Sequence, residues 1–224
     1  MPLSTTDPAT QPPTTGDDGG RLGRDLGGDE APSRALAWLL LAAGVLGVLA
    51  AGVLTVEKIA LLTDSSYVPS CSLNPVLNCG SIMRTDQAEV FGFPNPLLGL
   101  AAFPLLSATG LGLLAGARFR RWYWLGLQAG VTLGAAFVVW LVFQSLYRIN
   151  ALCPYCMVVW AVVAAVFWTV TAHNTRTGVL GERLRTHPAG HVLVAYSPTL
   201  VSLTVVVVLV LATQRFWDYW VTLV

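Results

Sequence analysis

Four cysteines in this chain fall into two pairs whose spacing suits disulfide chemistry. One pair belongs to the motif Cys-Pro-Tyr-Cys at residues 153–156. Because proline is favoured at the first position of a helix, the motif predicts a helix start with Cys153 as the N-cap and Cys156 at the third helical position. Unpaired N–H groups and the positive end of the helix dipole face both sulfurs there, and they stabilise the thiolate that disulfide exchange requires.

The other pair, Cys71 and Cys79, encloses seven residues that include Asn74, Pro75 and Asn78. These turn-forming residues predict an irregular loop. Taken alone, the pair is as consistent with a structural disulfide as with a redox-active one, and four cysteines permit three connectivities. A redox relay would form more than one of these disulfide connectivities in turn. Electrons would then pass from an outside protein to the loop pair and from there to the helix pair.

The elements that must position these pairs are membrane-spanning helices. Hydrophobic residues make up 54% of the 224 residues and charged residues 11%, against about 25% charged in soluble domains. The mean hydropathy is +0.63 and the formal net charge is +1. These values exclude a disordered chain, a nucleic-acid binder and an ordinary cytosolic enzyme. Five uncharged stretches each exceed the roughly 20 residues that cross a bilayer; they are 35–56, 97–117, 122–147, 151–172 and 192–214.

These stretches predict an all-α integral membrane protein. The first four spans lie within 34–173, and an outer loop at 57–96 between the first two carries the first cysteine pair. A polar tail over 1–33 is expected to be disordered and cytoplasmic. A cytoplasmic loop at 174–191 then leads to a fifth transmembrane helix and a short outer C-terminus within 192–224.

Arginine placement predicts the orientation of the spans. Nine cations lie beside the spans on one side and four on the other, so the positive-inside rule places the N-terminus in the cytoplasm of a multi-pass cell-membrane protein. The nine are Arg21, Arg24, Arg34, Arg118, Arg120, Arg121, Arg176, Arg183 and Arg185, and the four are Lys58, Arg84, Arg148 and Arg215. All four cysteines then face the outer, oxidising side. Glu57 and Lys58, which follow the first span, are expected to be boundary charges that reach water.

The electron acceptor must be soluble in lipid, because the chain carries no flavin, haem or nucleotide motif beside its membrane-embedded dithiol. A quinone fits, and it could approach Cys156 inside the bundle. Twelve Arg against one Lys indicate a GC-rich genome, which favours menaquinone over ubiquinone. No metal is expected, although two other functions stay open. One is a four-thiolate metal site, which the seven residues between Cys71 and Cys79 disfavour. The other is a structural membrane protein with two inert disulfides.

The combination of two loop cysteines after the first span, Cys-x-x-Cys at the start of the fourth, and Asn-Pro-Leu-Leu-Gly at 95–99 resembles bacterial homologues of vitamin K epoxide reductase. The resemblance covers roughly residues 36–172. It implies a four-helix catalytic core over 34–173, a bundle around a quinone with the loop capping its outer mouth. It also implies a quinone-dependent thiol-disulfide oxidoreductase that reoxidises a disulfide-forming partner. Some relatives carry a fused thioredoxin domain after span five; none follows here, so we expect the partner to be a separate extracytoplasmic thioredoxin-fold protein of the DsbA type.

The same resemblance implies a role for each site residue. Cys71 would meet the protein partner, Cys79 would exchange with Cys153, and Cys156 would contact the quinone. Asn95 matches the asparagine that hydrogen-bonds a quinone carbonyl in this family. Three further residues are expected at the quinone; they are Thr85, at the family's Ser/Thr position, its neighbour Ser81, and Trp160, which stands where animal members carry a tyrosine.

Overall fold

The computed structural model describes residues 32–221, so most of the predicted disordered tail and the last three residues lie outside the described part. Within it the chain is helical, and five helices are long and apolar enough to cross a membrane. They are α2 (Arg34–Thr63), α4 (Pro96–Leu114), α5 (Arg121–Phe143) with its π-helical extension η2 (Gln144–Ile149), α6 (Pro154–Arg176) and α9 (Ser197–Arg215). The prediction of an all-α, multi-pass membrane protein is confirmed.

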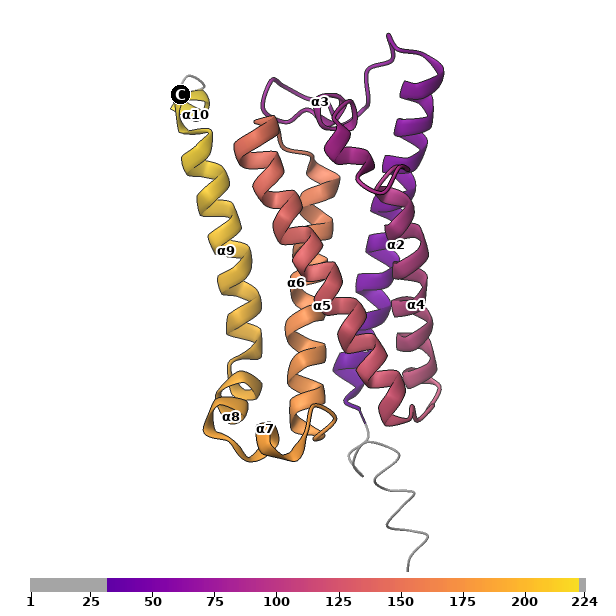
Figure 1. Cartoon of the computed structure of the whole chain (residues 1–224), viewed down its shortest axis with the longest axis vertical. Helices are drawn as coiled ribbons and strands as arrows, with labels where there is room; N and C mark the ends of the chain where they lie inside the picture. The colour runs from indigo at the N-terminus through magenta and orange to yellow at the C-terminus, as the bar shows by residue number, and fades with distance from the viewer. Residues whose placement is uncertain (1–31, 222–224) are drawn as a thin grey trace, which may run out of the picture.

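The five long helices run up and down beside one another, with α9 at one edge (Figure 1). α2 packs most extensively against α4, while α6 contacts α2, α5 and α9. Helices α2, α4, α5 and α6 therefore form the bundle, and α9 packs on its outside against α6. Much of α5 and α9 is exposed, as is expected of helices whose outer faces meet lipid rather than water.

Small residues allow α2 and α4 to approach closely. A Cβ built on Gly110 of α4 would lie 2.7 Å from the carbonyl oxygen of Ala37, and one on Gly99 would lie 2.9 Å from the Cβ of Ala51. Because glycine has no side chain, the two helix backbones can approach closely at these positions. Close packing of this kind drives helix association in a membrane, where lipid tails are as apolar as the side chains and the hydrophobic effect contributes little. The closely packed pair forms one wall of the bundle.

Two predicted boundaries differ in the structure. α2 continues seven residues past the predicted end of the first span, to Thr63, because Glu57 and Lys58 are buried and continue the helix. The expectation that these two charges reach water is wrong. The predicted fifth span is divided, since α8 (Pro188–Ala195) ends before α9, which begins at Ser197 with Pro198 in its first turn. The short helix α7 (Glu182–Thr186) occupies the predicted inner loop.

The outer loop folds into two short helices, α3 (Cys79–Met83) and the 3₁₀ turn η1 (Asp86–Glu89), which lie over the same end of the bundle as the start of α6 (Figure 1). A single parallel bridge joins Leu77 of this loop to Leu152, just before α6. The Leu152 N–H donates to the Val76 carbonyl at 2.8 Å, and the Asn78 N–H donates to the Leu152 carbonyl at 2.9 Å. These two bonds tie together segments that are more than 70 positions apart in the chain.

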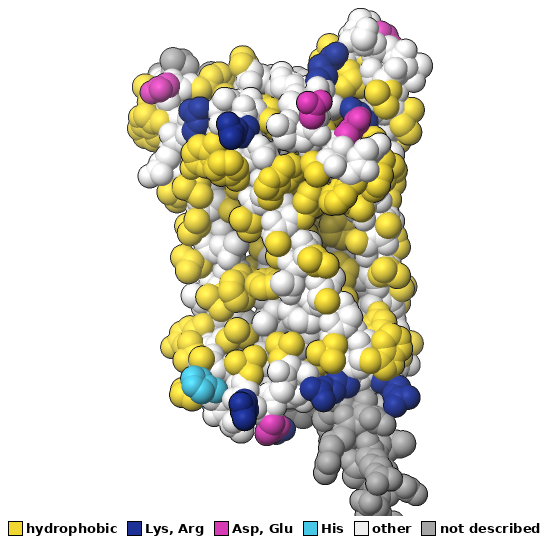
Figure 2. Space-filling view, viewed as in Figure 1, with side chains coloured by type: hydrophobic (Ala, Val, Ile, Leu, Met, Phe, Trp, Pro, Cys, Tyr) yellow, Lys and Arg dark blue, Asp and Glu magenta, His cyan; other side chains and the backbone are white. Residues whose placement is uncertain are grey.

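Charged side chains gather at the two ends of the molecule and leave an apolar middle (Figure 2). The end that holds the outer loop also holds α10 (Trp217–Val221). The opposite end holds α7, α8 and the start of α2. Because α2, α5 and α9 run towards the end with the outer loop, while α4 and α6 run away from it, all four cysteines lie at that end.

Candidate active site

Three of the four sulfurs lie together at the outer-loop end of the bundle. Cys71 and Cys79 form a disulfide, and the Cys153 sulfur lies 3.2 Å from the Cys79 sulfur. All three side chains are buried, with exposures of 4%, 0% and 1%. Cys153 and Cys156 are free thiols. Since disulfide exchange proceeds by attack of a thiolate on a disulfide sulfur, Cys153 is close enough to exchange with Cys79.

Local structure on both sides brings Cys79 and Cys153 together. Cys79 is the first residue of α3, whose N-cap is Asn78, with a side-chain oxygen that accepts from the Ser81 N–H at 3.0 Å. Cys153 is the N-cap of α6 and Pro154 follows at its first turn, as the sequence predicts. The bridge between Leu77 and Leu152 joins the residues that precede these two helix starts by one or two positions.

The Cys153 thiol is prepared to act as a nucleophile. A hydrogen bond from the Cys156 side chain lowers its pKa below the usual cysteine value, against the opposing effect of burial, and the backbone N–H groups of Cys156 and Tyr155 lower it further. The Cys156 N–H lies 3.4 Å from the Cys153 sulfur. A larger fraction of Cys153 is therefore thiolate at neutral pH than for an ordinary cysteine.

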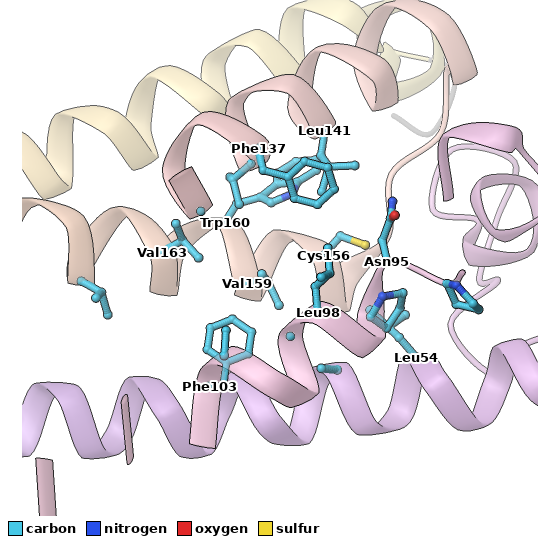
Figure 3. A pocket seen from close by; sticks show the side chains of 18 of the residues that line it. Leu54, Asn95, Leu98, Phe103, Phe137, Leu141, Cys156, Val159, Trp160 and Val163 are labelled. Carbon is cyan, nitrogen blue, oxygen red and sulfur yellow. The ribbon is translucent and has the colours of Figure 1, made fainter. Parts of the chain in front are cut away.

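Cys156 lies deeper, on the wall of a cavity of about 520 Å³ inside the bundle. Apolar side chains from α2, α4, α5 and α6 make up most of the wall, among them Leu54, Leu98, Phe103, Phe137, Leu141, Val159 and Val163 (Figure 3). Cys79 and Cys153 line the end of the cavity nearest the loop. In Figure 3 the sulfur of Cys156 points toward the side on which Asn95 lies. The cavity thus connects the dithiol at the helix start with the apolar interior.

Two predicted quinone contacts carry buried polar atoms without a partner. The Asn95 amide nitrogen donates to the Gln87 carbonyl at 2.7 Å, while its Oδ1 is buried and unpaired. Trp160 is 4% exposed, and its Nε1 is also buried and unpaired. Both side chains line the cavity (Figure 3). Asn95 stands at the start of α4 without capping it, so helix capping does not account for it. Buried polar groups are normally hydrogen-bonded, so both atoms are available to a polar group in the cavity.

The structure does not bring Ser81 and Thr85 to this cavity. Ser81 is exposed on α3, and only its backbone N–H takes part in the cap of that helix. The Thr85 hydroxyl donates to the Ile82 carbonyl at 2.7 Å, at the end of α3. Neither residue belongs to the cavity wall. The geometry therefore gives no support for a contact between these two side chains and a ligand in the cavity.

Sequence reasoning missed the buried contacts of Glu57 and Lys58. The Glu57 carboxylate accepts hydrogen bonds from Tyr67 and Ser70, and the Lys58 ammonium donates to the Met83 carbonyl and pairs with Glu89. All of these partners belong to the outer loop or its short helices. The sequence does contain a signal, because two charges stand directly between an apolar stretch and the cysteine loop. This position alone does not show whether the charges are buried or solvated.

The cysteine geometry fits a disulfide relay better than a metal site. Cys71, Cys79 and Cys153 have sulfurs within 4.8 Å of one another. Cys156 is outside this group, and the Cys71–Cys79 disulfide removes two of its members as thiolate ligands. The other alternative, two inert disulfides, also differs from this arrangement, in which Cys153 and Cys156 are free.

A helical bundle that spans the membrane, with a disulfide held against a free thiol at one end, defines a membrane protein of thiol-disulfide chemistry. The model of the vitamin K epoxide reductase family matches residues 38–171. The chain belongs to this family, and this membership makes it a membrane thiol oxidoreductase of a family that generally uses a quinone. No curated protein and no solved structure matches the chain.

Proposed function

We propose that this protein reoxidises an extracytoplasmic disulfide-forming protein of the thioredoxin fold and passes the electrons through its two cysteine pairs to a membrane quinone. The observation that carries the proposal is the 3.2 Å distance between the sulfurs of Cys79 and Cys153, which joins the loop pair to the helix pair. Neither pair alone can connect a protein outside the bilayer with an acceptor inside it.

The first exchange takes place at the loop. A thiolate of the reduced partner attacks the sulfur of Cys71 and releases the Cys79 thiolate. The second thiolate of the partner then attacks the mixed disulfide, so that the partner leaves oxidised and the loop pair is left as two thiols. Cys71 is 4% exposed, so the loop has to move for a protein thiol to reach it.

The second exchange takes place between the pairs. The Cys79 thiolate attacks Cys153 in the Cys153–Cys156 disulfide and releases Cys156. Cys71 then attacks Cys79, which restores the loop disulfide and releases the Cys153 thiolate. The structure has the loop disulfide together with two free helix thiols, which is the arrangement at the end of this exchange. The lowered pKa of Cys153 makes it a good leaving group in the last step.

The cavity suits a quinone as the final acceptor. A quinone held here would take two electrons and two protons from the Cys153 and Cys156 thiols, which would be left joined as a disulfide. Trp160 offers an N–H to a carbonyl oxygen, and the unpaired Oδ1 of Asn95 offers an acceptor to the hydroxyl of the reduced form. Cys156 lines the wall between them (Figure 3) and would face a ring held there. The apolar remainder of the cavity suits a prenyl chain, and we expect menaquinone rather than ubiquinone.

The proposed site requires one orientation in the membrane. The N-terminus and the α7–α8 end would face the cytoplasm, and the cysteine end would face outward from the cell membrane. Seven of the nine cations predicted on the inner side lie within the described residues, all at the end opposite the cysteines. In this arrangement residues 34–173 are the catalytic core and α9 is an accessory helix.

Quinone reduction by purified protein tests the proposal. In lipid nanodiscs with menaquinone, a reduced thioredoxin-fold donor should drive quinone reduction by the wild type. Cys156→Ser should abolish it while the Cys71–Cys79 disulfide still forms, because the change removes the free thiol that lies deeper along the cavity wall and leaves the loop pair intact. Ser65→Ala, in an exposed part of the same loop, is the control and should turn over normally. Full turnover by Cys156→Ser would refute the proposed electron route.

A further inference from the structure

Glu57 and Lys58 are consecutive residues near the outer end of α2, and each is 7% exposed. Burying a charge is costly unless it is paired and hydrogen-bonded. Consecutive residues of a helix point in different directions, so the two side chains reach different neighbours. Their neighbours are the two flanks of the segment that carries the Cys71–Cys79 disulfide.

Glu57 holds the flank that precedes Cys71. Its carboxylate accepts from the Tyr67 hydroxyl at 2.8 Å, from the Ser70 hydroxyl at 2.5 Å and from the Ser70 backbone N–H at 3.3 Å. Ser70 is the residue directly before Cys71. The short bond to Ser70 and the Tyr67 bond fix both ends of the four residues that lead into the disulfide.

Lys58 holds the flank that follows Cys79. Its ammonium donates to the Met83 carbonyl at 2.6 Å and pairs with the Glu89 carboxylate at 2.7 Å. Met83 is the last residue of α3, the helix that begins at Cys79, and its buried side chain packs in one cluster with Cys71, Cys79 and Cys153. Lys58 thereby fixes the far end of the single short helix that presents Cys79 to Cys153.

We propose that Glu57 and Lys58 are positioning residues that form a two-armed clamp, in which Glu57 keeps Cys71 shielded and Lys58 keeps the Cys79 sulfur against Cys153. The inference rests on the proposed function, because it assigns the clamp to the exchange between the two cysteine pairs. The two arms have distinct effects. Loss of the Lys58 arm slows internal exchange, whereas loss of the Glu57 arm opens Cys71 to outside thiols.

The Lys58 arm is tested in full-length Cys156→Ser protein. In this background the Cys153 thiolate attacks Cys79, the Cys79–Cys153 bond forms, the Cys71–Cys79 bond breaks, and the electron pair leaves on the Cys71 sulfur as a thiolate. No outside oxidant or reductant takes part. Acid quenching, denaturation, alkylation and peptide mapping then measure how fast the free thiol moves from Cys153 to Cys71.

Lys58→Met in this background should slow the transfer about 10-fold or more, because small displacements of reacting atoms carry large rate penalties. Lys58→Arg retains the charge and the donors and should restore most of the rate. The matched control is Arg84→Gln, which removes an exposed cation of the same loop that reaches only the Ser65 carbonyl in the described structure. An unchanged rate in Lys58→Met, or equal slowing in Arg84→Gln, would overturn the role of Lys58.

The Glu57 arm is tested with Cys153 and Cys156 both replaced by serine, so that only the loop disulfide remains. Dithiothreitol should reduce this disulfide about 5-fold faster in Glu57→Gln, because reduction depends on access to the sulfur. Asp64→Asn is the matched control, since Asp64 is an exposed loop carboxylate that, among residues 32–221, accepts only from Ser66. Equal reduction rates in the parent protein and Glu57→Gln would overturn the shielding role.

The pattern of rates separates a clamp from a general loss of structure. General loss would slow exchange and speed reduction in both variants alike, whereas the clamp predicts that Glu57→Gln leaves the Cys153-to-Cys71 transfer within about twofold of its parent. Glu57→Asp, which retains the charge, provides a second variant if the glutamine protein is poorly folded, and its reduction rate should lie between the two. Absence of any transfer in the parent Cys156→Ser protein would refute the proposed function and the clamp together; transfer that is insensitive to Lys58 would refute the clamp alone.

Discussion

At the scale of single residues, one neighbour sets the reactivity of Cys153. The Cys156 side chain donates the hydrogen bond that contributes most to the lowered pKa of the Cys153 thiol. In a Cys71→Ala/Cys79→Ala background, which prevents exchange, Cys156→Ala should raise the Cys153 pKa, so that the thiolate forms only at higher pH. Cys156→Ser keeps a hydroxyl donor and should retain most of the lowering. Ultraviolet absorbance of the thiolate, titrated against pH, measures both, and a midpoint in the alanine variant at or below that of the serine variant would contradict the assigned cause.

Local rules are sufficient for Cys153 and insufficient for Glu57 and Lys58. The N-cap assignment depends on Pro154 and on residues within three positions, and the structure confirms it. The partners of the two buried charges lie from 10 to 31 positions further along the chain. An acid and a base at the end of an apolar stretch look the same in a sequence whether water or a folded loop surrounds them. Only the folded position of the loop shows that these charges are buried.

At the scale of elements, the contact between α2 and α4 depends on glycine. A Cβ on Gly110 would meet backbone atoms of Ala37 and Leu41, which cannot rotate away. Gly110→Ala should therefore lower the free energy of unfolding by about 1–3 kcal/mol. Gly52→Ala in α2 is the control, since nothing lies within 4 Å of its added Cβ. It should be neutral or stabilise by up to about 1 kcal/mol. Unfolding in detergent micelles measures both, and similar destabilisation by the two changes would argue against a close backbone contact.

The number of helices is predictable from the sequence because the bilayer imposes the same length on every span. Their ends are less predictable. Helix α2 runs on to Thr63 because tertiary contacts bury two charges that a hydropathy pattern treats as the end of the span. Helix η2 ends at Asn150, whose backbone is left-handed, a conformation that asparagine adopts more readily than most residues. Placement of Cys79 depends on a bridge to Leu152, and no periodicity in either segment indicates that pairing.

At the scale of the whole molecule, α6 connects the site to the rest of the bundle. It begins at the cysteine motif, lines the cavity with Val159 and Trp160, and contacts α2, α5 and α9. The C-terminal end of α9 is tied to the same region, since Arg215 donates to the Leu146 carbonyl at 3.0 Å and also binds Asn150. Helix α9 thus braces the turn that leads into Cys153.

The orientation of the whole molecule decides which compartment supplies the partner. With the cysteines replaced by alanine, Ser65→Cys, in the exposed loop, and Ala189→Cys, at the exposed start of α8, introduce one thiol at each end of the bundle. Loops rich in Lys and Arg stay on the cytoplasmic side of a membrane. Neither cysteine substitution removes an Arg or Lys, so the orientation should not change. A membrane-impermeant maleimide should therefore label Ser65→Cys in spheroplasts of a bacterial host and label Ala189→Cys only after permeabilisation. The reverse pattern would place the cysteine loop in the cytoplasm, where reducing systems keep thiols reduced, and an extracytoplasmic partner could no longer reach Cys71.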